Sequence, residues 1–168
     1  MAEEQNQGAA EQEQQQAQFQ LQKLYVKDIS FEVPNSPQIF QEEAQVEIKM
    51  NLAQKVETLT ENVQEVVLTV TVTALLGEKT AYLAEVQQAG IFAISGLGEQ
   101  ATHAALNTLC PSTLFPYARR VITDMVADGG FPPLVLQPLN FDQIYAQRLQ
   151  EAQSQAAASE DLEVQGNA

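Results

Sequence analysis

The chain has 168 residues, 45% of them hydrophobic, and a formal net charge of −14. Its length fits one folded domain with a buried core, and its acidic balance argues against binding nucleic acid and favours a basic partner. A charge that only keeps the protein in solution is the alternative explanation. Because no apolar run reaches about 18 residues and the N-terminus lacks a secretory-signal pattern, we expect no membrane insertion.

The first strand follows a polar segment. Residues 1–18 are rich in Gln and Glu, have no apolar period and are predicted to be disordered. Alternation from Phe19 onward predicts a long strand that ends before Pro34. Its apolar parity, with Lys23 and Lys27 as exceptions, comprises Phe19, Leu21, Tyr25, Ile29, Phe31 and Val33. The opposite parity, which places two carboxylates on one polar face, comprises Gln20, Gln22, Leu24, Val26, Asp28, Ser30 and Glu32.

Three further strands are expected. Apolar and polar residues alternate over 46–52, which predicts a second strand, and the polar residues 53–62 are interpreted as a connection. Residues 63–94 predict a β-hairpin that reverses at Gly77, since glycine accepts the positive φ of a tight turn. One face of this hairpin is apolar. On its second strand, Leu83 and Glu85 lie on the opposite, outward face.

The second half of the chain predicts helices. Residues 99–109 form one candidate, and Pro111 fits the first turn of a longer one that runs to about Ala127. A glycine pair ends that helix, a proline-rich extended segment follows, and Asn140 is a candidate N-cap for a last helix.

Four successive strands followed by helices predict an α+β domain, with a four-stranded antiparallel sheet and helices packed on one face. The domain is expected over residues 19–151, with a flexible acidic tail over 152–168. The helix over 111–127 has an apolar pattern on two sides, which favours self-association with helices sandwiched between sheets. A monomer whose helix is covered by the proline-rich segment is the alternative.

Catalytic and metal-binding patterns are not found in the sequence. His103 and Cys110 are the single histidine and cysteine, and their spacing matches no zinc motif. The glycines near residue 97 do not complete a dinucleotide fingerprint, and no phosphate-binding loop or nucleophile elbow occurs. We therefore expect no enzyme activity, no metal and no cofactor.

Aromatic residues indicate instead a polypeptide-binding surface. A groove between sheet and helices could accept unfolded chain through apolar contact, and its candidate residues are Phe40, Tyr82, Tyr117 and Tyr145. For each of these residues an ordinary core position is the alternative.

Four strings carry a family resemblance: LYVKDISFEVPNSP at 24–37, EVVLTVTVTALLGEKTAYLAEVQQAGIF at 65–92, LCPSTLFPYAR at 109–119 and LNFDQIY at 139–145. With these strings, residues 19–150 resemble the bacterial protein-export chaperone family SecB. The glutamine-rich N-terminal segment is longer than expected for the family, and Ala84 stands where some members have cysteine.

The resemblance implies an ATP-independent holdase in the cytoplasm. Such a protein is a homotetramer, a dimer of dimers; it binds unfolded secretory preproteins, keeps them competent for translocation and delivers them to the motor SecA. The positions that match the SecA-contact surface of the family are Asp28, Glu32, Leu83 and Glu85. Those that match its tetramer-assembly stretch are Ala84, Val86 and Gln88.

Two alternatives to export remain at this point. A chaperone of the same fold could serve another client, such as the antitoxin of a toxin–antitoxin pair, and neighbouring genes would distinguish this case. A protein that binds a small ligand in the same groove is the other alternative.

Overall fold

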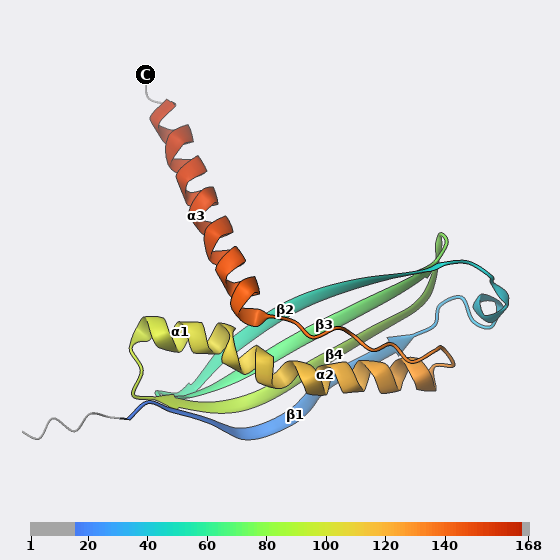
Figure 1. The fold of residues 1–168 in the computed structure, drawn as a ribbon, viewed down its shortest axis with the longest axis horizontal. Helices are drawn as coiled ribbons and strands as arrows, with labels where there is room; N and C mark the ends of the chain where they lie inside the picture. Colours follow the sequence, from blue (N-terminus) through green and yellow to red (C-terminus); the bar gives the residue numbers. More distant parts are fainter. Residues whose placement is uncertain (1–15, 166–168) are drawn as a thin grey trace, which may run out of the picture.

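A computed structural model describes residues 16–165, with side chains described as far as residue 156. The expected N-terminal disorder over 1–18 therefore falls mostly outside the described residues. The elements follow the order β1 (Gln18–Glu32), β2 (Val46–Thr60), β3 (Val63–Leu76), β4 (Lys79–Ser95), α1 (Glu99–Asn107), α2 (Leu109–Asp128) and α3 (Phe141–Gln165) (Figure 1). A short 3₁₀ helix, Gln38–Gln41, lies between β1 and β2.

The four strands form one antiparallel sheet in the order β1-β4-β3-β2. This confirms the predicted α+β class and sheet. β1 and β2 are not neighbours, because the 33–45 segment carries the chain to the opposite edge of the sheet (Figure 1). Gly77 has a φ of 60° in the β3–β4 turn, as the hairpin prediction requires.

The second strand is longer than the sequence indicates. β2 continues to Thr60, so the interpretation of residues 53–62 as a connection is wrong. The second half of β2 is paired with β3 through Lys55–Val67 and Thr58–Gln64. A strand is formed by backbone hydrogen bonds, which do not require apolar side chains. The polar composition of residues 53–60 therefore gave no indication of a strand.

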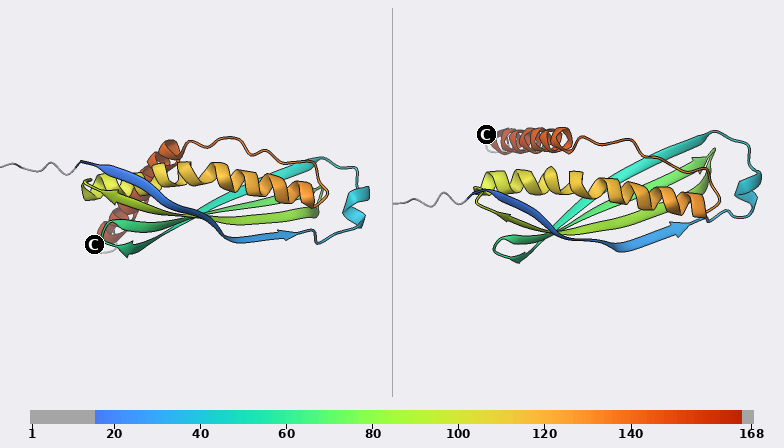
Figure 2. Two further views of the ribbon diagram at one scale, coloured as in Figure 1. Left: turned by 90° about the horizontal axis from the view of Figure 1, so that it is seen from below. Right: turned by 60° about the horizontal axis from the view of Figure 1, so that its bottom comes forward.

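One face of the sheet, here called the inner face, is covered by helices. α2 packs on β4, β3 and β1, and Figure 2 shows α1 and α2 along the same side of the sheet. The fully buried residues of this core include Val66, Val70, Val72, Val86, Phe92, Leu114, Ile122 and Val126. In the described part of the chain, no helix packs on the opposite, outer face (Figure 2).

The helices begin and end close to the predicted positions. Thr108 separates α1 from α2, and Pro111 lies in the first turn of α2. The backbone amide of Gln143 donates a 3.0 Å hydrogen bond to Asn140 Oδ1, which confirms the predicted N-cap of α3. α3 contacts α1 and α2 only near its start, then projects away from the sheet (Figure 1). Its helical backbone extends to Gln165, past the predicted start of a tail near Ala152.

The solvent side of α2 differs from the prediction. Its buried stripe agrees with the expected one, with Leu114, Ala118 and Ile122 all at 0% exposure. The other side is mixed rather than apolar, because the exposed Tyr117 lies near an Arg120–Asp124 pair of 3.5 Å. The apolar pattern expected on a second side of this helix is therefore interrupted by charged residues.

Candidate functional site

The outer face of the sheet brings the predicted SecA-contact residues together. In the β1–β4 ladder, Glu32 is paired with Leu83, and Asp28 is paired with Gln87. Glu85 lies between those two pairs, opposite Ser30. Antiparallel partners direct their side chains to the same face, so Asp28, Glu32, Leu83 and Glu85 form one surface, here called the acidic docking face.

Two β-bulges in β1 determine which residues reach this face. The register shifts between Leu21 and Lys23 and again between Val26 and Asp28. Each extra residue reverses the side-chain parity, so Val26 points inward, opposite Gln88, whereas Asp28 points outward. A single parity from residue 20 to 32 was therefore a wrong expectation, although Asp28 and Glu32 do share the outward face.

The second bulge lies beside a charged cluster on the outer face. Glu65 of β3 is 7% exposed and accepts hydrogen bonds from the Tyr25 hydroxyl and from Lys27 Nζ, the latter at 2.7 and 3.0 Å. The bonds from Lys27 and Tyr25 lower the pKa of Glu65, and the bond to Glu65 raises the pKa of Tyr25 to about 12. Because Lys27 is the unpaired residue of the bulge, this contact ties the bulge to β3 across β4.

The inner side of β2 forms an open apolar surface, here called the β2 trough. Its residues, Val46, Ile48 and Met50, point to the core side but remain 52, 37 and 39% exposed, because α2 lies mainly over β4 and β3. At one end of the trough a pocket of about 240 Å³ lies between β2, Tyr82 and the 131–134 segment. The hydroxyl of Thr123 donates a 2.6 Å hydrogen bond to the carbonyl of Leu134, which holds that segment against α2.

The structure divides the four predicted groove aromatics. Phe40 and Tyr82 belong to one aromatic cluster, since each packs on Phe131, with ring centroids 5.1 and 4.9 Å apart. Tyr117 lies on the other flank of the domain, in a pocket with Leu24 and Val26 of β1. Tyr145 lies on α3, where its hydroxyl is 2.9 Å from His103 Nδ1.

The predicted assembly residues lie inside the subunit. Ala84 and Val86 are 0% exposed and Gln88 is 2% exposed, all on the inner face beneath α2. Gln88 Nε2 donates a 2.9 Å hydrogen bond to the carbonyl of Tyr25, whereas Gln88 Oε1 is buried without a hydrogen-bond partner. Any contribution of these side chains to assembly would therefore act through the strand and helix that they support.

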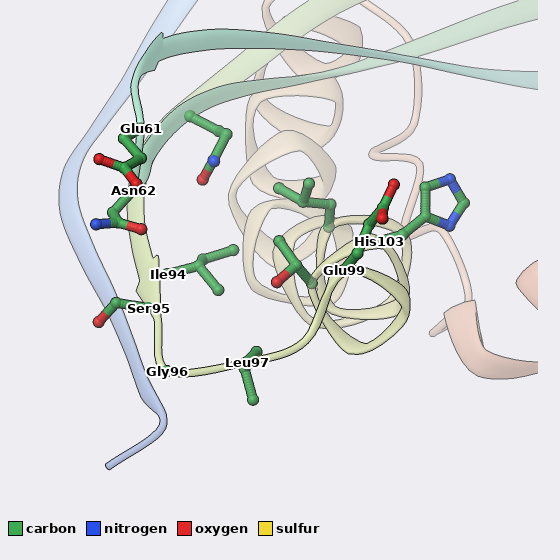
Figure 3. A pocket seen from close by; sticks show the side chains of 11 residues that line it. Glu61, Asn62, Ile94, Ser95, Gly96, Leu97, Glu99 and His103 are labelled. Atoms are coloured by element: carbon green, nitrogen blue, oxygen red, sulfur yellow. The ribbon is translucent and has the colours of Figure 1, made fainter. Parts of the chain in front are cut away.

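A further hollow of about 410 Å³ lies at the far end of the sheet. Figure 3 shows Glu61 and Asn62 on one wall and Glu99 and His103 on the opposite wall. Within the described residues there is no group of three or more potential metal ligands. Cys110 is buried, and burial raises the pKa of its thiol to about 12, which makes it a poor nucleophile.

Two features of this site, the open β2 trough and the position of Phe131 beside it, were not predicted, and only the second has a signal in the sequence. The alternation at Ile48 and Met50 predicts an ordinary half-buried strand, and nothing in the sequence indicates which helix would cover it. The signal for the second feature is that Phe131 directly precedes two prolines, which keep it out of a helix, and that aromatic residues are enriched at binding surfaces.

Comparison with known proteins decides the family. The family model "Preprotein translocase subunit SecB" matches residues 12–152 of the chain. The chain belongs to the SecB family. The protein-export protein SecB of Nitrosococcus oceani is 52% identical over 160 residues, which cover 94% of this chain and 98% of that protein. SecB of Stenotrophomonas maltophilia is 51% identical over 152 residues, which cover 89% and 88%.

A solved structure has a similar fold. It is a SecB-like chaperone of Mycobacterium tuberculosis in complex with a ChAD peptide from the HigA1 antitoxin. The TM-score is 0.61 with 18% sequence identity, and the match covers 72% of this chain and 90% of that chain. The α+β arrangement of this SecB-family chain therefore also occurs in an experimentally determined chaperone structure. No helix in the described part of the chain is long and apolar enough to span a membrane.

Proposed function

We propose that this SecB-family chain holds unfolded preproteins in the β2 trough and passes them to the translocase motor SecA through the acidic docking face. As a SecB-family member, the chain is a protein-export chaperone. The observation that carries the rest of the proposal is the exposure of three apolar side chains, Val46, Ile48 and Met50, on the core-facing side of an edge strand.

The β2 trough suits an extended client without a fixed sequence. Apolar burial is worth roughly 25 cal/mol per Å² and has no directional requirement, so many side chains can fill the trough. β2 is an edge of the sheet, and its unpaired backbone groups can bond to the main chain of a client. The ring cluster around Phe131 would then hold a large apolar client residue at one end.

Aggregation of a refolding preprotein tests the holdase role. We expect the protein to suppress light scattering by a diluted, denatured preprotein, without nucleotide, at an equimolar ratio of assembly to client. The Ile48→Lys/Met50→Lys variant should lose most of this effect, because burying two ammonium groups opposes apolar binding. The Asn51→Lys/Ala53→Lys variant is the matched control, since it adds the same charge to the outward side of β2. Equal suppression by both variants would exclude the β2 trough as the client site.

The acidic docking face suits a cationic partner. Asp28, Glu32 and Glu85 form no ion pair within the described residues, so their charges remain available. Leu83 lies among them and adds a small apolar contact. The basic C-terminal region of SecA is the proposed partner, and the association should weaken as salt screens these charges.

We also propose that four copies assemble as a dimer of dimers. The supporting observation is a second uncovered apolar surface on the inner side of β1, where Val26 and Ile29 are 44 and 52% exposed. Tyr117 of α2 borders this surface at 46% exposure, and the unpartnered Gln88 Oε1 lies behind it. A second copy would remove these apolar groups from water.

Light scattering coupled to size exclusion tests the assembly. We expect the mass of four chains for the unmodified protein and smaller species for Val26→Glu, since a carboxylate on the β1 surface resists burial between copies. Val135→Glu is the control, because Val135 is also an exposed valine, at 65%, but lies outside this surface. A single-chain mass for the unmodified protein would contradict the assembly.

The remaining parts of the proposal follow from the export role. Preproteins must be bound before translocation, which places the chaperone in the cytoplasm. The work is binding and release, so we propose no enzymatic step and no bound cofactor.

A further inference from the structure

Glu85 lies at the centre of the acidic docking face, and its carboxylate is held by a neighbour. Thr71 of β3 is the direct cross-strand partner of Glu85, and Thr71 Oγ1 donates a 2.8 Å hydrogen bond to Glu85 Oε2. Ser30 of β1 lies opposite Glu85 on the other side of β4. The residues directly opposite Glu85 on both neighbouring strands are therefore short, and among the described residues the bond from Thr71 is the side-chain hydrogen bond that orients the carboxylate.

Glu65 and Glu85, two of the glutamates on the outer face, differ in the kind of partner they have. Glu65 is ion-paired with Lys27, so its charge is already compensated within the subunit. Glu85 has a neutral hydroxyl partner and, among the described residues, no lysine or arginine within ion-pair distance. A hydroxyl donor fixes the position of a carboxylate without neutralising it.

From this contrast we infer that Thr71 is a positioning residue of the docking face, which orients the Glu85 carboxylate for a cationic partner. The inference rests on the proposed docking function of that face. A carboxylate has about four acceptor sites, so the bond from Thr71 leaves Oε1 and part of Oε2 free to accept N–H donors.

The location of Thr71 suits this role. β3 is a central strand of the sheet, paired with both β4 and β2, and is therefore a stable support for the Thr71 side chain. Threonine is β-branched and has restricted χ1 rotation, so its hydroxyl is held in place. With Glu85 oriented in advance, less side-chain entropy is lost when the partner binds.

Neighbouring threonines provide matched controls. Thr69 and Thr73 have the same parity on β3, where they face Gln87 and Leu83, respectively. Neither donates a side-chain hydrogen bond to a carboxylate within the described residues. Replacement of any of the three by valine keeps the shape and the strand preference and removes only the hydroxyl.

Calorimetric titration with purified SecA tests the role of Thr71. We expect Thr71→Val to weaken the affinity about three- to fivefold, and Thr71→Ser, Thr69→Val and Thr73→Val to remain within about twofold of the unmodified protein. In a Glu85→Gln background, Thr71→Val should cause no further loss of affinity for SecA, because the charge that it orients is gone. This double-mutant cycle separates orientation of Glu85 from a general effect on the sheet.

Other results overturn the inference in distinguishable ways. If Glu85→Gln weakens binding but Thr71→Val does not, Thr71 has no positioning role and the docking face stands. The role is also excluded if Thr71→Val costs the same affinity with Gln at position 85 as with Glu. If Glu85→Gln itself leaves SecA affinity unchanged, the docking face is wrong and the role of Thr71 is excluded with it.

Discussion

Replacing Glu85 by lysine should lower the affinity for SecA by about tenfold or more, while the fold and client binding persist. The substitution places a cation between Asp28 and Glu32 and repels a basic partner in the middle of the contact. Its effect on the free energy of unfolding should stay within about 0.5 kcal/mol, since Glu85 lies on the helix-free face and has no ion-pair partner within the described residues.

Calorimetric titration at low and high salt measures this effect. The control is Glu78→Lys, which makes the same change in net charge at the exposed β3–β4 turn, outside the acidic docking face. The difference in affinity between the two variants should shrink at high salt, because ions screen surface charges over about 10 Å at 0.1 M. Equal losses of affinity in both variants would indicate a general charge effect and would exclude a localised docking face.

Truncation of Leu114 to alanine should lower the free energy of unfolding by about 3 kcal/mol, the largest stability effect that we predict. Leu114 is 0% exposed and lies where α2 crosses the sheet. A Cβ built on Gly90 would lie 3.0 Å from Leu114 Cδ2 and 2.7 Å from the ring of Phe92. The leucine therefore fills space that a glycine in β4 leaves open, and its removal creates a cavity that a rigid sheet cannot close.

Chemical denaturation followed by circular dichroism measures the change in unfolding free energy. Leu149→Ala is the control, because Leu149 lies on α3 and is 43% exposed, so its truncation should cost less than about 1 kcal/mol. The denaturation is best compared at equal protein concentration, since assembly adds to apparent stability. A loss below about 1 kcal/mol for Leu114→Ala would show that α2 is not packed on Gly90 as described.

The bulges of β1 could have been predicted from the sequence. Apolar residues occupy odd positions at Phe19 and Leu21, even positions at Leu24 and Val26, and odd positions again from Ile29. Each change of parity requires one extra residue in a strand whose apolar side stays on the core. The two lysine exceptions lie at these changes: Lys27 is the extra residue of the second bulge, and Lys23 directly follows the first.

The groove aromatics could not be assigned in the same way. An aromatic residue at an apolar position has the same local pattern in a core, a groove or an interface. Only the packing of α2 on β4, β3 and β1 separates Tyr117 from Tyr82, and only the direction of α3 takes Tyr145 to His103. The polar second half of β2 was also missed. It is held to β3 by backbone hydrogen bonds, which leave no pattern in the side chains.

The existence of four strands, the Gly77 turn, the α2 stripe and the Asn140 cap follow from the sequence alone, because each depends on side-chain periodicity or on the backbone preference of one residue. The polar second half of β2 does not. The tertiary structure decided which surfaces remain open. The crossing from β1 to β2 makes these two strands the edges of the sheet, and α2 is too narrow to cover both. A helix about 10 Å wide spans about two strands, which lie about 4.8 Å apart, so apolar side chains on the edge strands remain accessible.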